Sequence, residues 1–275
     1  AFPERFFNIG IAESNLVSIG AGLAACGFIP FITSFSSFLL CNAYDQIRLC
    51  IALSNINAKI LGGHGGITLG KDGPTQMGIE DLALVGGWPT FTILVPSDPT
   101  SMHKAVAAAV AHPGPVFVRS SRVAMPYIYP PDDCPFEIGK ANVVRQGHDV
   151  TLIGCGIMVA MSLDAAAILA EEGIQARVID MHTLRPWDVE TLAAAARETG
   201  AIVTAEEHLL QGGMGSNIAR IVAGIHPVPM RFVGLNDTYA ESADPDDLLR
   251  KYGLTAEHIA AAARQAIAAK SAKAK

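Results

Sequence analysis

The chain has 275 residues, a formal net charge of -6 at pH 7 and hydrophobic side chains at half of its positions. This length allows two domains of ordinary size with ample core. The acidic balance argues against nucleic-acid binding, because lysines cluster only in the tail at 270–275. Five cysteines without Cys-x-x-Cys spacing predict a reducing, cytoplasmic setting with neither disulfides nor a metal site. Since the sequence starts at Ala1 without a methionine, we expect some N-terminal residues to be missing.

Short apolar strands alternate with helices along the whole chain, which is typical of parallel sheets covered by helices. In the first part, the sequence predicts strands at 6–9, 28–32, 58–61, 91–95 and 116–119, and helices at 14–26, 37–51, 79–84 and 99–111. In the second part, it predicts strands at 150–153, 176–180, 201–205 and 230–233, and helices at 158–172, 189–199, 216–223 and 256–269. We therefore expect an α/β protein with two three-layer α/β/α domains.

A proline-rich stretch from Met125 to Phe136 separates the two parts, because it cannot form a helix or a central strand. Charge density changes at the same place, since residues 1–120 hold fewer than a third of the charged side chains. We expect domains at 1–121 and 147–270, joined by a linker at 122–146 and followed by a frayed tail at 271–275. The charge-poor part should bury surface against another subunit, which predicts self-association through residues 1–120.

Glu13 stands directly before a run of residues, 14–44, that contains no charged side chain. The run is longer than the roughly 20 residues that span a bilayer. Its glycines, Pro30 and scattered polar residues nevertheless predict helix, strand and helix in a protein interior. Burial disfavours the ionised form of a carboxylate, so Glu13 is suited to hold a proton and share it with a bound base. The alternative is a structural glutamate at the surface end of a buried helix.

The segment from His64 to Gln76, HGGITLGKDGPTQ, follows a predicted strand and is rich in glycine and small polar residues. Loops at the carboxyl ends of parallel strands line ligand sites, so His64 and Asp72 are candidate ligand-binding residues. Arg119, at the end of the strand 116–119, is a third candidate. Taken separately, these residues also fit a surface histidine, a turn at Asp72 and an interface salt bridge at Arg119.

Two glycine patterns match nucleotide-binding motifs only in part. Gly65, Gly70 and Lys71 match most of a phosphate-binding loop, but Asp72 stands where a metal-binding Ser or Thr is required. Gly154 and Gly156 follow a predicted strand as a dinucleotide fingerprint does, but Val159 occupies the position of its third glycine. We favour neither interpretation.

Several motifs along nearly the whole chain are shared with one family: Asn8-Ile9-Gly10-Ile11-Ala12-Glu13, the pair Phe35 and Phe38, HGGITLGKDGPTQ, Val116-Phe117-Val118-Arg119, Glu206-Glu207-His208 and Gly212-Gly213-Met214-Gly215-Ser216. With these motifs the chain resembles the C-terminal half of a transketolase. The resemblance implies a domain that binds the pyrimidine of thiamine diphosphate, followed by a transketolase C-terminal domain.

The resemblance also implies roles for single residues. Glu13 matches the glutamate that bonds the N1' nitrogen of the thiamine aminopyrimidine and so takes part in catalysis. Phe38 matches the aromatic residue that stacks on the pyrimidine, with Phe35 beside it, and Cys41 stands where transketolases have a tyrosine near this ring.

The sugar site is implied in the same way. His64, also a candidate catalytic residue, and Asp72 match residues that contact sugar hydroxyls, and Arg119 matches an arginine that holds the sugar phosphate. Gln76 stands where transketolases usually have a histidine, so the acceptor preference is open.

The family signature for the metal and diphosphate, Gly-Asp-Gly followed by an Asn about 25 to 30 residues later, does not occur in this sequence. The resemblance therefore implies a separate N-terminal subunit that holds Mg²⁺ or Ca²⁺, a shared thiamine diphosphate site and a two-plus-two heterotetramer acting on sugar phosphates. The alternatives are a deoxyxylulose-phosphate synthase or another thiamine carboligase, and a regulatory subunit that has lost catalysis.

Overall fold

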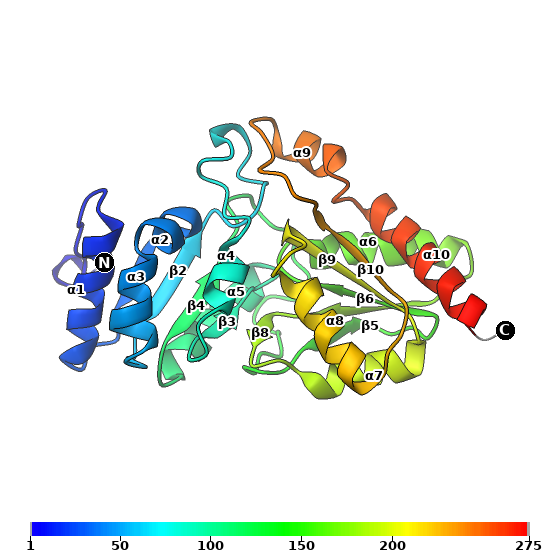
Figure 1. Ribbon diagram of the computed structural model, residues 1–275, viewed down its shortest axis with the longest axis horizontal. Coiled ribbons are helices and arrows are strands. Elements are labelled where there is room, and N and C mark those ends of the chain that lie inside the picture. Colours follow the sequence, from blue (N-terminus) through cyan, green and yellow to red (C-terminus); the bar gives the residue numbers. More distant parts are fainter. Residues whose placement is uncertain (1, 274–275) are drawn as a thin grey trace.

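The computed structural model describes residues 2–273 and contains two five-stranded sheets that lie side by side (Figure 1). The first sheet has the order β1-β2-β4-β3-β8 and the second the order β10-β9-β6-β7-β5. The strands of the first sheet are β1 (Phe31–Phe35), β2 (Lys59–Gly63), β3 (Thr92–Leu94), β4 (Val116–Arg119) and β8 (Thr183–Arg185). Those of the second are β5 (Asn142–Arg145), β6 (Val150–Gly154), β7 (Ala176–Asp180), β9 (Ile202–Leu209) and β10 (Met230–Leu235).

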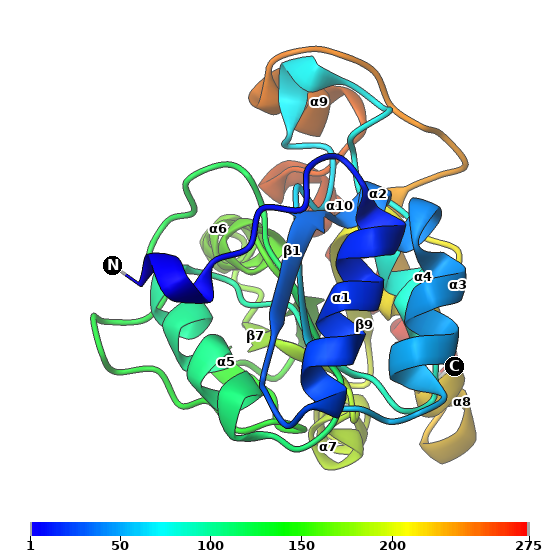
Figure 2. The same cartoon turned by 90° about the vertical axis from the view of Figure 1, so that its left-hand side faces the viewer.

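Helices cover both faces of each sheet. The helices of the first part are α1 (Glu13–Ala25), α2 (Ser36–Asn42), α3 (Tyr44–Gln46), α4 (Asp81–Gly86) and α5 (Pro99–Ala111). Helices α1 to α4 lie on one side of the first sheet and α5 on the other (Figure 2). The second part contains α6 (Met158–Glu171), α7 (Val189–Thr199), α8 (Met214–Ile225), α9 (Pro245–Lys251) and α10 (Ala256–Lys273). Helices α6 and α10 pack together against the second sheet, as do α7 and α8, which confirms the predicted pair of three-layer α/β/α domains.

Local signals explain where several elements begin and end. Asp98 accepts a hydrogen bond from the Ser101 amide in a capping box, and Pro99 opens α5 at the predicted residue. Helix α7 ends where Gly200 adopts a φ of 65°, a conformation that glycine adopts without strain. The same local chemistry can be read from the sequence, so both helices have the predicted limits.

Some predicted elements are wrong or incomplete. The predicted strand at 6–9 does not form, and a 3₁₀ turn (Pro3–Arg5) precedes irregular backbone there. The predicted helix 37–51 is broken into α2, α3 and a π-helical segment (Ile47–Ala52). A further 3₁₀ turn (Gly70–Asp72) and the elements β5, β8 and α9 were not predicted, because strands of three or four residues and short helices give little periodicity.

The two parts of the chain interleave. Strand β8, which lies inside the predicted second domain, pairs antiparallel with β3 of the first sheet. Strand β5, which lies inside the predicted linker, pairs antiparallel with β7. The domain limits given above therefore remain a prediction. Helix α10 continues to Lys273, and residues 274–275 of the predicted tail lie outside the described residues.

Within residues 2–273, every helix is too short or too polar to cross a membrane.

Candidate active site

The predicted cofactor residues meet where β1 ends and α1 and α2 begin. Glu13 is the first residue of α1, and only 8% of its surface is exposed. Its Oε1 accepts a hydrogen bond of 3.2 Å from the Ser34 hydroxyl. Phe35, at the end of β1, stacks on Phe38 of α2 with ring centroids 5.1 Å apart. The structure thus brings a buried carboxylate and an aromatic platform to the same end of the sheet.

His64 joins this group from the next strand. It follows β2, has a φ of 62°, and its imidazole stacks on Phe35 at 3.7 Å between centroids. Its Nδ1 is buried without a hydrogen-bond partner. Burial and then the charge of Arg122 lower the pKa of His64, against the opposite effect of Asp72. The imidazole is therefore neutral at pH 7 and can exchange hydrogen bonds with a hydroxyl group.

Asp72 lies in the exposed part of the loop that follows β2. Its carboxylate is 3.7 Å from Nη1 of Arg122, and about half of each side chain is exposed. Arg122 also donates a hydrogen bond of 3.3 Å to the Leu69 carbonyl. A loosely held, exposed guanidinium keeps donors free for an anion. We did not predict a role for Arg122, although its position just after β4, outside the strand, could have suggested one.

Arg119, the predicted phosphate ligand, lies in a buried network of the protein interior. The side chain is 5% exposed, and its Nε donates a hydrogen bond of 2.8 Å to the Asp81 carboxylate. Its Nη2 donates to the carbonyls of Gly78 at 2.7 Å and Glu207 at 3.1 Å. As the last residue of β4, Arg119 points into the interior and forms a buried salt bridge with Asp81, and its role in binding the sugar phosphate remains a prediction.

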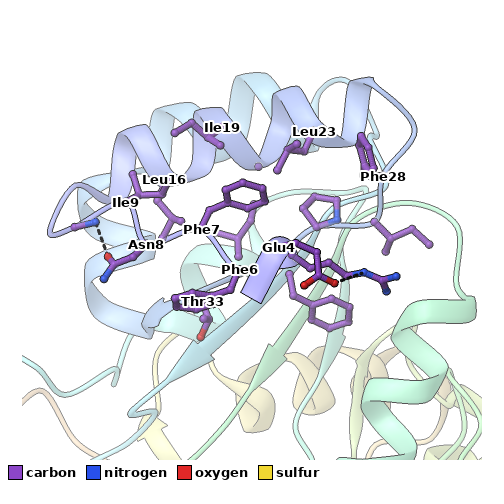
Figure 3. Close-up of a pocket in the computed structure, with 17 residues that line it drawn as sticks. Glu4, Phe6, Phe7, Asn8, Ile9, Leu16, Ile19, Leu23, Phe28 and Thr33 are labelled. Carbon is purple, nitrogen blue, oxygen red and sulfur yellow. Dashed lines mark hydrogen bonds and ion pairs between the residues drawn. The ribbon is translucent and has the colours of Figure 1, made fainter. Parts of the chain in front are cut away.

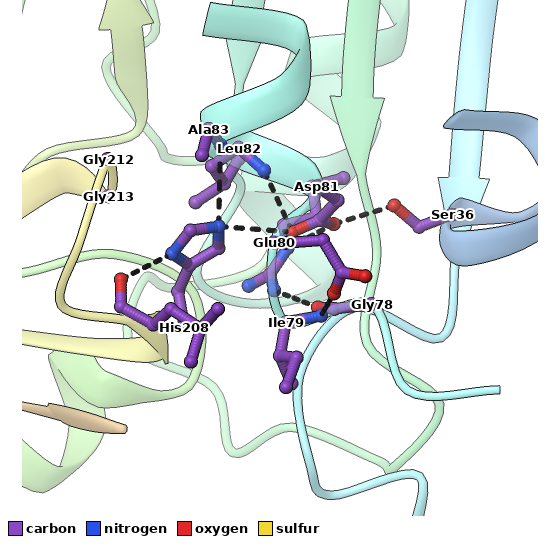
Figure 4. Close-up of polar contacts among 12 residues, drawn as sticks. Ser36, Gly78, Ile79, Glu80, Asp81, Leu82, Ala83, His208, Gly212 and Gly213 are labelled. Carbon is purple, nitrogen blue, oxygen red and sulfur yellow. Dashed lines mark hydrogen bonds and ion pairs between the residues drawn. The ribbon is translucent and has the colours of Figure 1, made fainter. Parts of the chain in front are cut away.

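Asp81 is the centre of this buried network (Figure 4). It accepts hydrogen bonds from Arg119 and, at 2.6 Å, from the Ser36 hydroxyl. Burial alone would raise the pKa of Asp81, but Arg119 and the hydrogen bonds hold it below its usual value. The ring of His208 lies 3.8 Å away. Burial lowers the pKa of His208 to about 4, so the ring is neutral at pH 7 and forms no ion pair.

Cys41 and Gln76 lie at the margins of the candidate site. Cys41 is exposed on α2, one turn beyond Phe38, with its thiol 4.0 Å from the Glu80 carboxylate. Partial burial, followed by the charges of Glu80 and Asp81, raises the pKa of this thiol. The carbonyl of Gln76 accepts a hydrogen bond from Ser37, while its side-chain oxygen is buried without a partner. The roles of both residues remain predictions.

A large apolar pocket of about 840 Å³ lies elsewhere, between the N-terminal segment, α1 and β1 (Figure 3). Phe6, Phe7 and Leu23 line it, and its charged lining residues are Glu4 and Arg5, both exposed. None of the predicted site residues lines this pocket. Its chemistry fits an interaction surface better than a catalytic centre.

The strand ends β1, β2 and β4 therefore carry the candidate site, as expected of an α/β protein whose ligands bind at the carboxyl ends of parallel strands. The family model "Transketolase, pyrimidine binding domain" matches residues 1–126, and "Transketolase, C-terminal domain" matches residues 139–259. The chain belongs to the transketolase family.

Individual relatives agree with this assignment. The 6-deoxy-6-sulfo-D-fructose transketolase subunit SqwH of Clostridium sp. (strain MSTE9) is 40% identical over 96% of this chain and 81% of its own length. An apulose-4-phosphate transketolase subunit of Phocaeicola vulgatus is 38% identical over 94% of this chain and 82% of its own.

A synthase and a solved structure are also similar. The 1-deoxy-D-xylulose-5-phosphate synthase 1 of Geobacter sulfurreducens is 39% identical over 99% of this chain but only 43% of its own length. A solved structure described as a split gene transketolase, inactive beta4 tetramer, superposes with a TM-score of 0.93 at 44% identity, covering 98% of this chain and 86% of the other. The expected resemblance to C-terminal subunits of split transketolases is thus confirmed.

Proposed function

We propose that this chain is the C-terminal subunit of a thiamine-diphosphate-dependent transketolase. With an N-terminal partner subunit, it would transfer a two-carbon ketol unit from a ketose phosphate to an aldose phosphate. The observation that carries the proposal is the meeting of the buried Glu13 carboxylate with the stacked rings of Phe35, Phe38 and His64 at the end of the first sheet.

The described residues fit the aminopyrimidine of thiamine diphosphate. Glu13 accepts one hydroxyl hydrogen bond on Oε1, so Oε2 is left for a ring nitrogen. Phe38 and Phe35 offer a flat apolar face of the kind on which aromatic rings stack. The unpartnered Nδ1 of His64 lies beside the same platform.

Each residue has a separate task in the proposed reaction. Thiamine diphosphate, when bound, supplies the electron sink for breaking and forming the carbon–carbon bond. Glu13 would share a proton with the pyrimidine nitrogen through Oε2, because its buried carboxyl group lies at the aromatic platform and accepts the Ser34 hydrogen bond on Oε1. Phe38 orients the ring, and the neutral His64 exchanges a hydrogen bond with a sugar hydroxyl.

Arg122 is our candidate for the anionic end of the substrate, in place of Arg119. It is exposed, it lies across from Asp72, and it follows the end of β4. A guanidinium can bind a phosphate through two charge-assisted hydrogen bonds. Two similar proteins are named for sugars that carry a sulfo group and a phosphate, which supports an anionic substrate here.

A partner subunit completes the proposed site. The sequence lacks the Gly-Asp-Gly motif with its downstream Asn, so Mg²⁺ or Ca²⁺ and the diphosphate would bind mainly to the N-terminal subunit, in a two-plus-two assembly. A similar chain that forms a tetramer by itself is described as inactive, which supports this division. We place self-association on the apolar face around Phe7, Phe28 and Leu23, whose exposed area a second copy would cover.

A deoxyxylulose-phosphate synthase is the second candidate function, because one such enzyme is 39% identical over 99% of this chain. The two activities separate in one assay of the mixed subunits. A transketolase uses two sugar phosphates, whereas the synthase requires pyruvate and releases carbon dioxide. Carbon dioxide release from pyruvate, without ketol transfer between sugars, would overturn our assignment.

The Glu13→Gln variant tests the proposed function directly. Because glutamine keeps the shape of the side chain but cannot pass a proton, ketol transfer by the mixed subunits should fall about 10²- to 10⁴-fold. Saturation with cofactor should leave this loss in place. Glu171→Gln is the matched control, since Glu171 is an exposed glutamate at the end of α6, away from the candidate site, and should change turnover little. Equal turnover of both variants would show that Glu13 is only structural.

A further inference from the structure

The loop 64–76, which carries His64 and Asp72, is built into the second domain. Its apolar side chains Ile67 and Leu69 are at most 1% exposed and belong to the same core cluster as Leu152, Val233 and Leu248. At its tip, Lys71 forms an ion pair of 3.0 Å with Asp244. Figure 1 shows the loop extending from the first sheet to α9. The candidate sugar-binding loop of one domain therefore takes its shape from the other.

Glu207 of β9 contacts this loop directly. Its Oε1 accepts a hydrogen bond from the Thr68 amide, and the side chain is 3% exposed. A Cβ added to Gly66 would lie 2.1 Å from the Glu207 carboxyl carbon, and Gly66 also has a φ of 88°. Only glycine at this position lets the loop come so close to the carboxylate.

The base of the loop is fixed by the same network. The Gly66 amide donates to the Gly78 carbonyl at 2.7 Å, and the Gly78 amide donates to the His64 carbonyl at 3.1 Å. Arg119 donates to the carbonyls of both Gly78 and Glu207. His64 is thus connected to β9 through a short series of buried hydrogen bonds.

We propose that Glu207 is a positioning residue for the sugar, because it holds the loop so that His64 and Asp72 face the substrate in a fixed arrangement. The second domain then sets the affinity for the sugar without touching it. The part of this proposal that concerns the sugar rests on the proposed transketolase activity, whereas the part that concerns the loop does not.

Glu206 offers a matched control on the same strand. Its carboxylate is fully buried like that of Glu207, but it accepts hydrogen bonds from the amides of Met214 and Gly215 at the start of α8, at 2.6 and 2.8 Å. Loss of this carboxylate should loosen α8 and leave the loop in place. Substitutions of Glu206 and of Glu207 both remove a buried carboxylate and so share any general loss of stability. A difference between them therefore reports on the loop.

The first measurement is amide hydrogen exchange in the isolated chain. Glu207→Ala should speed exchange in residues 64–76 about tenfold or more, because the loop opens more easily without the hydrogen bond between Glu207 and the Thr68 amide. Glu206→Ala should speed exchange at the start of α8 instead. Glu207→Gln, which keeps an acceptor and the side-chain volume, provides a milder variant if the alanine variant does not fold. Equal loop exchange in the Glu206 and Glu207 variants would overturn the proposal.

The second measurement is ketol transfer by the chain mixed with its N-terminal subunit. Glu207→Gln should raise KM for the sugar phosphate several-fold, while kcat and thiamine diphosphate affinity change little, since Glu13 and Phe38 lie outside the loop. A purely structural role would lower the amount of active protein and leave KM unchanged, and this result would overturn the link to the sugar. If no mixture shows ketol transfer, the proposed function fails, and the exchange data still decide whether Glu207 holds the loop.

Discussion

The protein contains the same three residue types, Asp, Arg and His, in two surroundings. Asp81, Arg119 and His208 are buried between the domains, with side chains at most 6% exposed. Asp72 and Arg122 lie half-exposed beside the half-buried His64. In the buried group Arg119 and Asp81 pair with each other and bind further buried groups, whereas the exposed group keeps donors free. Burial, more than residue type, decides which group supports the fold and which is available to a ligand.

The distances reflect this difference. The buried ion pair is 2.8 Å long and the exposed pair 3.7 Å. Exposed pairs at such a distance contribute about 0–1 kcal/mol to stability. A buried pair gains little over apolar residues, but removing one partner leaves a charge without compensation. The two arginines should therefore respond differently to the same substitution.

Arg119→Met should have the largest effect on stability. It leaves the fully buried Asp81 carboxylate without its cation, which typically costs about 3–5 kcal/mol. Urea unfolding of the isolated chain measures the change, with Arg122→Met as the control. A loss of equal size in both variants would contradict the assignment of Arg119 to the interior network.

Arg122→Met should instead act on the substrate. Hydrogen bonds to charged groups contribute about 1.5–3 kcal/mol, so KM for a phosphorylated sugar should rise about 10- to 100-fold. KM for the same sugar without its phosphate should stay nearly constant. A parallel rise for both sugars in steady-state assays would show that Arg122 does not recognise the anionic group.

His208→Gln should change the pH dependence of stability. Burial lowers the pKa of His208 from 6.5 to about 4, so the unfolded state binds its proton more readily. The contribution of His208 to the free energy of unfolding is complete above pH 6.5 and is lost as the pH falls toward and through 4. The variant lacks this contribution, so its free energy of unfolding should fall less steeply with decreasing pH, by at most about 1.4 kcal/mol per pH unit.

The measurement is urea unfolding at pH 7 and pH 5. Glu206, whose pKa is raised to about 7 by burial, has the opposite sign, because its stability contribution is lost as the pH rises toward 7. The contribution of Glu206 is the same in the wild type and the His208→Gln variant. The difference between their pH dependences therefore reports on His208 alone. Identical pH dependence in the two proteins would mean that folding does not lower the pKa of His208.

The smallest expected effect concerns the pKa of His64 and tests whether Asp72 and Arg122 both face its ring. Arg122 lowers the pKa of His64 and Asp72 raises it. Arg122→Met should therefore raise this pKa, and Asp72→Asn should lower it further. NMR titration of the His64 ring protons measures both shifts. Shifts of the same sign in the two variants would show that the two charged groups do not face His64 as the structure has them.

Local sequence signals were sufficient for much of the fold. Asp98, Pro99 and Gly200 specify helix ends through their own backbone and side-chain chemistry, and the apolar runs of β4 and β7 specify buried strands. The charge-free run after Glu13 likewise predicted helix, strand and helix, and α1, β1 and α2 form there. These features depend on neighbours along the chain, so they can be read without the tertiary structure.

Only the tertiary structure distinguished Arg119 from Arg122. The two lie three residues apart, yet the first ends a strand and turns inward, while the second follows the strand and faces solvent. The pairing of β8 with β3 and the contact of Glu207 with the loop join residues about 90 to 140 positions apart. Sequence periodicity describes the environment of one element at a time, whereas contacts between distant elements follow from how the two sheets pack.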